Sequence, residues 1–206
     1  MTRELPAFVA WAAGPRVATM HQQVVAARQE ACRSVMPLGR RWLHVQAVAA
    51  AADDVASQLG LDAGVLVSAA WLHDIGYAPE LRETGFHPID GARYLRQEGW
   101  DERIVSLVAH HSCARFEAPI RGLAAELAEF PRPPVEYEDA LCYCDMTNGP
   151  GGDQVDASDR LDEIQRRYGP GDPVTLFVEA ARPEILASVG RIQDRLRVSG
   201  SRASAH

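Results

Sequence analysis

The stretch that most constrains this chain is the run VLVSAAWLHDIG, which extends from Val65 to Gly76. Apart from His73 and Asp74, it contains almost only apolar and small residues, so a helix built from it has no broad polar face to turn toward water. We therefore predict a buried helix at the centre of the fold, with Gly76 as its C-terminal cap.

The pair formed by His73 and Asp74 lies at the C-terminal end of this predicted helix. A carboxylate beside an imidazole is costly to bury unless a positive charge satisfies it, and a divalent cation would do so. The alternative is structural, with Asp74 reaching solvent just past the helix end beside a histidine of the core. The pair alone does not decide between these interpretations, so ligand-type residues elsewhere in the chain matter.

Composition indicates one ordinary domain. The chain has 206 residues, 47% of them hydrophobic, and its net charge of −7 argues against a general nucleic-acid binder, although local arginines could hold one phosphate. The four cysteines form neither a CxxC pair nor a disulfide framework, which favours a reducing cytoplasm. The apolar run Phe8 to Ala13 is too short to span a membrane, so we predict no membrane association and interpret residues 1–16 as a tail or packing arm.

Helical patterns fill the rest of the chain, and no segment shows the alternation of a strand. Val17 to Met36 predicts an accessory N-terminal helix, and Val174 to Val198 predicts a C-terminal one. Between them, Arg40 to Leu59 keeps apolar residues at a spacing of three to four. We predict an all-α fold, with a single helical domain at residues 17–198 and a disordered C-terminal tail at residues 199–206.

Several histidines fall at inward or helix-terminal positions. His44 lies on the apolar stripe of the helix predicted from Arg40 to Leu59, although a core histidine with a backbone partner would occupy the same place. His87 precedes Pro88 at the start of a further predicted helix, after a polar loop with room for a substrate lid. Both histidines are therefore candidate ligands.

The next predicted helix ends in a pair of histidines. His111 follows three, four and seven residues after apolar positions, whereas His110 lies a turn aside, so we rank His111 above His110 as the inward ligand and keep both as candidates. Asp145 lies among cysteines, a tyrosine and a methionine, which is unusual company for a solvated acid. It completes a set of possible ligands from five segments.

Imidazoles together with carboxylates suit iron, manganese, zinc or a similar divalent ion, and the lack of thiolate pairs disfavours a purely structural zinc. One or two ions would fit this number of ligands. One ion could take His44, His73, Asp74 and Asp145, leaving positions for water. A second could share Asp74 and add His87 and His111.

Five short segments carry a family resemblance: RWLH at Arg41 to His44, LHDIG at Leu72 to Gly76, GFHPIDGARYL at Gly85 to Leu95, HHS at His110 to Ser112, and CYCDM at Cys142 to Met146. In order and spacing they resemble the HD-domain superfamily of metal-dependent phosphohydrolases. The resemblance covers about half the chain and implies an all-helical core whose defining ligands are His44, His73, Asp74 and Asp145. His87 and the second histidine position resemble the binuclear branches. No GYP sequence follows His111, so the resemblance does not extend to cyclic-dinucleotide phosphodiesterases of the HD-GYP type.

Two enzyme classes fit this pattern. The first hydrolyses a phosphate ester or anhydride, for example in a nucleotide, with a metal-activated water and with His73 and Asp74 as catalytic residues. Arg41 and Arg115 are the candidate anchors for a small phosphorylated or anionic substrate, although arginines near helix ends are common on surfaces. The second class is a diiron oxygenase of the HD-domain type, which the six-ligand pattern also resembles. A sensor with a vestigial site is disfavoured because every expected ligand is present, and a homo-oligomer is compatible with all of these hypotheses.

Overall fold

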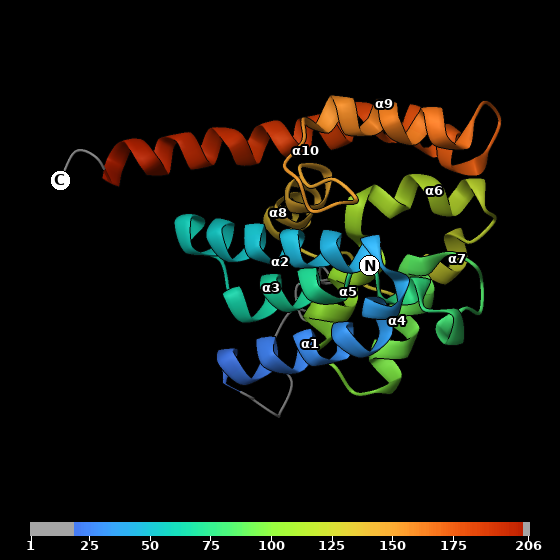
Figure 1. Cartoon of the computed structure of the whole chain (residues 1–206), viewed down its shortest axis with the longest axis horizontal. Helices are drawn as coiled ribbons and strands as arrows, with labels where there is room; N and C mark the ends of the chain where they lie inside the picture. The colour runs from blue at the N-terminus through green and yellow to red at the C-terminus, as the bar shows by residue number, and fades with distance from the viewer. Residues whose placement is uncertain (1–18, 204–206) are drawn as a thin grey trace, which may run out of the picture.

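The computed structural model describes residues 19–203, and of residues 202 and 203 only the backbone. Within that range the chain is built from α-helices, short 3-10 turns and loops, without a strand (Figure 1). The helices are α1 (Met20–Val35), α2 (Arg40–Leu59), α3 (Ala63–Leu72), α4 (His87–Gln97), α5 (Glu102–His110), α6 (Ala114–Ile120), α7 (Ala124–Leu127), α8 (Val135–Met146), α9 (Ala157–Tyr168) and α10 (Pro173–Ala203). The all-α prediction is confirmed.

Helix α3 is the buried centre of this arrangement. Asp62 caps its first turn by accepting a hydrogen bond from the Val65 amide. Every residue of α3 except Ala63 and Trp71 is buried, and the helix packs against α1, α2, α5 and α8. The apolar run therefore lies inside the bundle, as the absence of a polar face requires.

The end of α3 differs from the prediction, because the helix stops at Leu72 and Gly76 does not cap it. Instead, Gly76 lies in a 3-10 turn, Ile75–Tyr77, that packs directly on the first turn of α4. A Cβ atom added at Gly76 would lie 2.1 Å from the His87 carbonyl oxygen, so only glycine permits this approach. The glycine thus brings His87 beside the end of α3.

A second break follows α5 and redirects the chain. Ser112 and Cys113 have φ angles of 47° and 61°, in the left-handed region that residues with a Cβ rarely adopt. The chain therefore leaves α5 through the 3-10 turn His111–Cys113 and starts α6 in a new direction. Arg115, one of the two candidate substrate anchors, follows this turn in the first turn of α6.

Helices α9 and α10 form a layer across one side of the bundle, where they lie alongside each other (Figure 1). Leu161 of α9 and Val178 and Ile185 of α10 belong to a hydrophobic cluster with residues of α8. Helix α10 continues to Ala203, so residues 199–203 are helical and the predicted disordered tail is wrong there. Residues 1–16 of the predicted arm and residues 204–206 lie outside the described range.

Candidate metal centre

The end of α3 places His73 with one ring nitrogen aimed into the site. Because the last carbonyls of a helix have no partner within it, the Ala70 carbonyl is free to accept a hydrogen bond from His73 Nδ1 at 2.8 Å. This bond leaves Nε2 as a lone pair, and that atom is buried without a hydrogen-bond partner among the described residues. A buried imidazole lone pair without a donor suits a metal ligand, because a cation would satisfy it.

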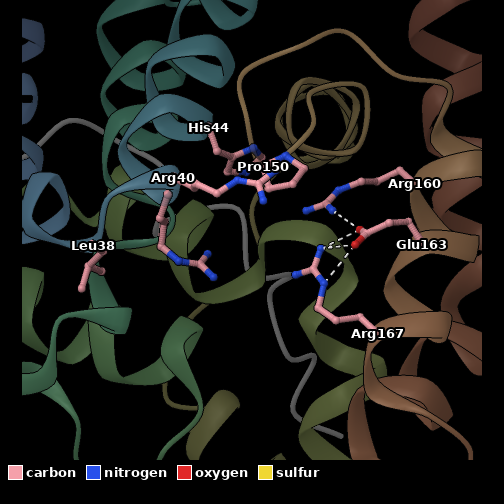
Figure 2. A pocket seen from close by; sticks show the side chains of 8 residues that line it. Leu38, Arg40, His44, Pro150, Arg160, Glu163 and Arg167 are labelled. Atoms are coloured by element: carbon pink, nitrogen blue, oxygen red, sulfur yellow. Dashed lines mark hydrogen bonds and ion pairs between the residues drawn. The ribbon is translucent and has the colours of Figure 1, made fainter.

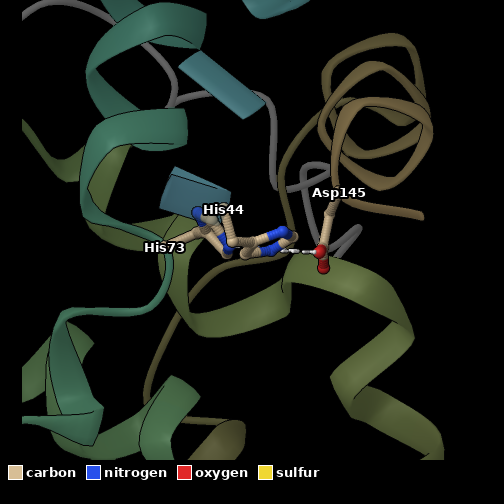
Figure 3. Close-up of side chains that lie close together, drawn as sticks. All are labelled: His44, His73 and Asp145. Carbon is tan, nitrogen blue, oxygen red and sulfur yellow. Dashed lines mark hydrogen bonds and ion pairs between the residues drawn. The ribbon is translucent and has the colours of Figure 1, made fainter. Parts of the chain in front are cut away.

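Helices α2 and α8 add His44 and Asp145 beside His73 (Figure 3). His44 Nε2 lies 3.0 Å from Asp145 Oδ1, and His73 Nε2 lies 4.0 Å from the same oxygen. His44 Nδ1 faces the Gly149 carbonyl at 3.2 Å, so Nε2 is the nitrogen available to the site. These three side chains form the first ligand group, with ligand atoms within 4.8 Å of one another.

Asp74, His87 and His111 form a second ligand group of the same compactness. His111 Nδ1 donates to the Val108 carbonyl at 2.6 Å, which repeats the arrangement of His73 at the end of another helix. Its Nε2 therefore carries a lone pair and lies only 3.0 Å from Nε2 of His87. Two imidazole nitrogens that converge in this way can share a cation.

Asp74 connects the two groups through its two carboxylate oxygens. Oδ2 lies 3.5 Å from His73 Nε2 and 4.0 Å from His44 Nε2, whereas Oδ1 lies 3.5 Å from His87 Nε2. A carboxylate whose oxygens face two ligand groups has the placement of a bridging ligand.

Electrostatics keep the carboxylates charged. Burial alone would raise the pKa of Asp74, but the Arg41 guanidinium and the surrounding imidazoles hold that pKa well below its usual range. Burial also opposes the charge on Asp145, yet the hydrogen bond with His44 and the nearby His73 lower its pKa. Both acids are therefore carboxylates at neutral pH, as cation binding requires.

The histidines divide by their environment. Burial lowers the pKa of His87 well below its ordinary value, and the neighbouring His111 adds to the effect. Burial lowers the pKa of His111, and the neighbouring His73 lowers it further. His44 is the exception: burial opposes its charge, but the hydrogen bond with Asp145 and the negative charges of Asp145 and Asp74 together raise its pKa. The two histidines of the second group are thus neutral at neutral pH, which is the form in which an imidazole binds a cation.

These donors fit divalent ions. Four imidazole nitrogens and two carboxylates suit iron, manganese or zinc, and no cysteine is among them. The orphaned nitrogen of His73 and the facing nitrogens of His87 and His111 each gain a partner when an ion binds. Ser112 supports the set by donating from Oγ to Asp145 Oδ2, a contact that its left-handed backbone makes possible.

A cavity of about 220 Å³ opens onto both ligand groups. Arg41 Nη1 donates to Asp74 Oδ2 at 2.5 Å, and its guanidinium lies 3.5 Å above the centre of the Tyr77 ring. The Tyr77 ring in turn stacks on His87 at 3.9 Å between centroids. Of the two arginines proposed as substrate anchors, Arg41 therefore lines this cavity and lies beside Asp74.

Two of the site residues proposed from the sequence, Arg115 and His110, lie outside this cavity and outside both ligand groups. Arg115 donates to Glu138 at 2.6 Å and lies 3.6 Å from Glu184, so it joins α6 to α8 and α10 and does not line the cavity. The left-handed turn before α6 is the reason, because it rotates the helix away from the direction of α5. His110 Nε2 donates to the Phe130 carbonyl at 3.0 Å and belongs to neither ligand group.

The sequence did not single out several polar residues that line the cavity, which are Tyr77, Ser112, Glu117, Arg121, Arg160, Arg167 and Tyr168. Arg160 and Arg167 are seven residues apart, a spacing that places them on one face of α9. That spacing was a usable signal, although it could not show what the face contacts. Burial raises the pKa of Glu117 despite its ion pair with Arg121.

Residues 41–146, just over half of the chain, match the family model of the HD domain. The chain belongs to the HD domain family. All six proposed ligands fall within the matched residues, and the match supports a metal-dependent phosphohydrolase at the level of the superfamily.

Several relatives are similar over less than half of this chain. Ribonuclease Y of Mesoplasma florum is 40% identical over 84 residues, which cover 40% of this chain and 17% of the relative. Ribonuclease Y of Opitutus terrae is 34% identical over 103 residues, 48% of this chain and 20% of that protein. A tRNA (cytidine(56)-2'-O)-methyltransferase of Thermoplasma volcanium is 36% identical over 75 residues, 36% of this chain and 22% of that protein.

The chain thus spans about a fifth of the length of these relatives. No solved structure matches it significantly. No helix in residues 19–203 is both long enough and apolar enough to cross a membrane.

Proposed function

We propose that the chain hydrolyses a phosphate ester or anhydride of a small phosphorylated compound at a centre of two divalent ions. The observation that carries the proposal is Asp74, whose two oxygens face two ligand groups at the floor of a cavity that arginines line. His44, His73 and Asp145 would hold one ion, His87 and His111 the other, and Asp74 both. Ions bound there would supply Lewis acidity and a water of lowered pKa.

The side chains of the protein supply charge and position. The low pKa values of Asp74 and Asp145 keep them as carboxylates, so that they can bind cations and accept a hydrogen bond from an attacking water. Arg41 is held by Asp74 and Tyr77 at the cavity, and its other N–H groups would donate to phosphoryl oxygens bound there. Tyr77 and Phe177 form apolar walls that limit water around the substrate.

The relatives support the same type of bond. Those named ribonuclease Y would act on phosphodiesters, and they are similar to part of this chain. The arginine lining of the cavity favours an anionic phosphoryl group over a neutral substrate.

The test compares two reactions on the same preparation. The protein is purified without oxygen, loaded with Mn²⁺ or Fe²⁺, and assayed in parallel for phosphate release from a panel of phosphate esters and anhydrides and for oxygen uptake. We expect phosphate release without oxygen uptake, lost in Asp74→Asn and retained in His110→Gln, because His110 lies outside both ligand groups. Iron-dependent oxygen uptake without phosphate release would identify an oxygenase and refute the proposal.

A further inference from the structure

A second cavity of about 400 Å³ adjoins the metal centre, and we name it the arginine groove. Its lining includes Arg40, Arg160, Glu163 and Arg167, shown in Figure 2 with the side chains entering from α2 on one side and from α9 on the other. Arg41, His44, Arg160 and Arg167 line both cavities, so the groove continues from the metal centre.

The groove carries an excess of positive charge. Four arginines and one glutamate line it, in a chain whose net charge is −7. Glu163 pairs with both Arg160, at 2.6 Å, and Arg167, at 2.5 Å, so one carboxylate serves two guanidinium groups. The side chain of Arg40 has no hydrogen bond or ion pair with any residue in the range 19–203. A cavity with this balance favours an anion.

Arg160 has a buried N–H donor that no acceptor satisfies among the described residues. Its side chain is only 12% exposed, and its Nε is buried without a hydrogen-bond partner in the part of the chain that the structure describes. Glu163 accepts from Nη1 of this residue. A guanidinium offers five N–H donors, and a buried donor without an acceptor is unfavourable, so an anion in the groove would satisfy it.

The wall of the groove is fixed by packing of α9 on α10. Leu161 is fully buried between these helices, and Arg182 of α10 donates to Asp162 at 2.6 Å and to Gln165 at 2.9 Å. Arg160 and Arg167 therefore point to the same side of a helix that is held in place. Helix α9 lies outside the residues that match the HD domain, so this wall is an addition to the family's shared part.

We propose that the arginine groove binds a second anionic group of the substrate, so that the substrates of this chain are small compounds with two phosphates, one at the metal centre and one in the groove. This inference rests on the proposed function, because it assigns the first phosphate to the metal centre. The two cavities share four lining residues, which allows one small molecule to occupy both. The acidic chain argues against a long nucleic acid, whose many phosphates would meet a negative surface.

Isothermal titration calorimetry on the metal-loaded full chain tests the inference with non-hydrolysable probes. The probes are methylphosphonate and alkane diphosphonates with two to four carbons between the phosphonates. We expect the best diphosphonate to bind the wild type at least about tenfold more tightly than methylphosphonate, since it adds one charge-assisted contact. Equal affinities for all probes would overturn the proposal.

Variants of α9 and α2 locate the second site. Arg167→Gln and Arg40→Gln should remove most of the diphosphonate advantage. Arg166→Gln is the matched control, because Arg166 carries the same charge on the same helix, is exposed and lines neither cavity, and it should keep the advantage. Glu163→Gln should increase the advantage by freeing both arginines. An equal loss in Arg166→Gln and Arg167→Gln would show general charge attraction and overturn the site.

Two further results separate this inference from its rivals. A single-stranded oligoribonucleotide that binds more tightly than every diphosphonate, and does so through Arg167, would overturn the assignment to small molecules. If no phosphate ester is hydrolysed but the diphosphonate advantage is present and depends on Arg167, the proposed function fails while the groove stands as an anion site. If hydrolysis is observed but the diphosphonate binds no more tightly than methylphosphonate, the proposed function stands and the anion site in the groove is wrong.

Discussion

The metal centre and the arginine groove share a boundary but hold their side chains in different ways. In the centre, His44, His73 and His111 are each oriented by a backbone carbonyl. In the groove, Arg160 and Arg167 are held by a shared carboxylate on their own helix, and the Arg167 side chain is 42% exposed. The centre is therefore rigid before any ligand binds, whereas the groove can adjust its guanidinium groups to the anion that enters.

Helix ends explain the rigidity of the centre. Helices α3 and α5 stop one residue before His73 and His111, and the unpaired carbonyls of their last turns accept from these histidines. Had α3 continued to Gly76, the Ala70 carbonyl would accept the Asp74 amide within the helix and could not orient His73. The error in the predicted end of this helix thus hid the feature that positions the ligand.

The largest expected effect tests the role of Asp74 in the centre. Asp74→Ala should lose both ions, since this carboxylate faces both ligand groups. His110→Gln should keep them, because a glutamine can still donate to the Phe130 carbonyl. Metal content by plasma mass spectrometry measures both. If the His110 variant loses as much metal as the Asp74 variant, the separation of the ligands from His110 is wrong.

The next effect concerns the support of Asp145. Ser112→Ala removes the hydroxyl that donates to this carboxylate and should weaken metal binding by about 10- to 100-fold. Ser112→Gly removes the same hydroxyl but suits the φ angle of 47°, so its thermal midpoint should exceed that of the alanine variant. Competition with a fluorescent chelator measures the affinity. Wild-type affinity in both variants would leave the hydroxyl without a role.

Arg115 tests whether an arginine outside both regions affects function. Arg115→Ala should leave metal content and turnover unchanged but lower the free energy of unfolding by about 1–2 kcal/mol, because Glu138 is nearly buried and loses one of its two arginine partners. Denaturant unfolding and steady-state kinetics measure the two quantities. A change in KM without a change in stability would return Arg115 to the substrate site.

The smallest expected effect is a pH dependence that comes from the histidines of the centre and not from the arginines of the groove. Burial lowers the pKa values of His87 and His111 in the folded chain. Below about pH 6.5 these two histidines therefore bind protons in the unfolded chain but stay neutral in the folded chain. Their contribution to stability is full above about pH 6.5 and is lost as the pH falls toward their folded pKa values. His44, with a raised pKa, contributes in the opposite direction.

The pH dependence of stability is measured as the thermal midpoint of chelator-treated protein between pH 5 and 8. His87→Gln should flatten the acid-side decrease, whereas Arg167→Gln should leave its slope unchanged, because an arginine stays charged throughout this range. A slope that is the same in the wild type and in His87→Gln would mean that His87 titrates alike in the folded and unfolded chain.

Much of the centre could be predicted because its ligands follow helical periodicity and motif spacing. The bounds of α2 match the predicted Arg40–Leu59, and the inward position of His44 follows from its apolar stripe. The turn at Ser112 and Cys113 could not be predicted, since neither is a glycine and nothing in the sequence marks a left-handed backbone there. The direction of Arg115 depended on that turn, and the groove depended on how α9 packs.

The central claim is that Asp74 lies between two bound ions, and anomalous diffraction from crystals of the manganese-loaded protein tests it most directly. We expect two anomalous peaks roughly 3.5–4 Å apart, one beside His44, His73 and Asp145 and the other beside His87 and His111. In crystals of His87→Gln only the first peak should remain. A single peak in the wild type at full metal occupancy, or a pair of peaks that does not flank Asp74, would contradict the account.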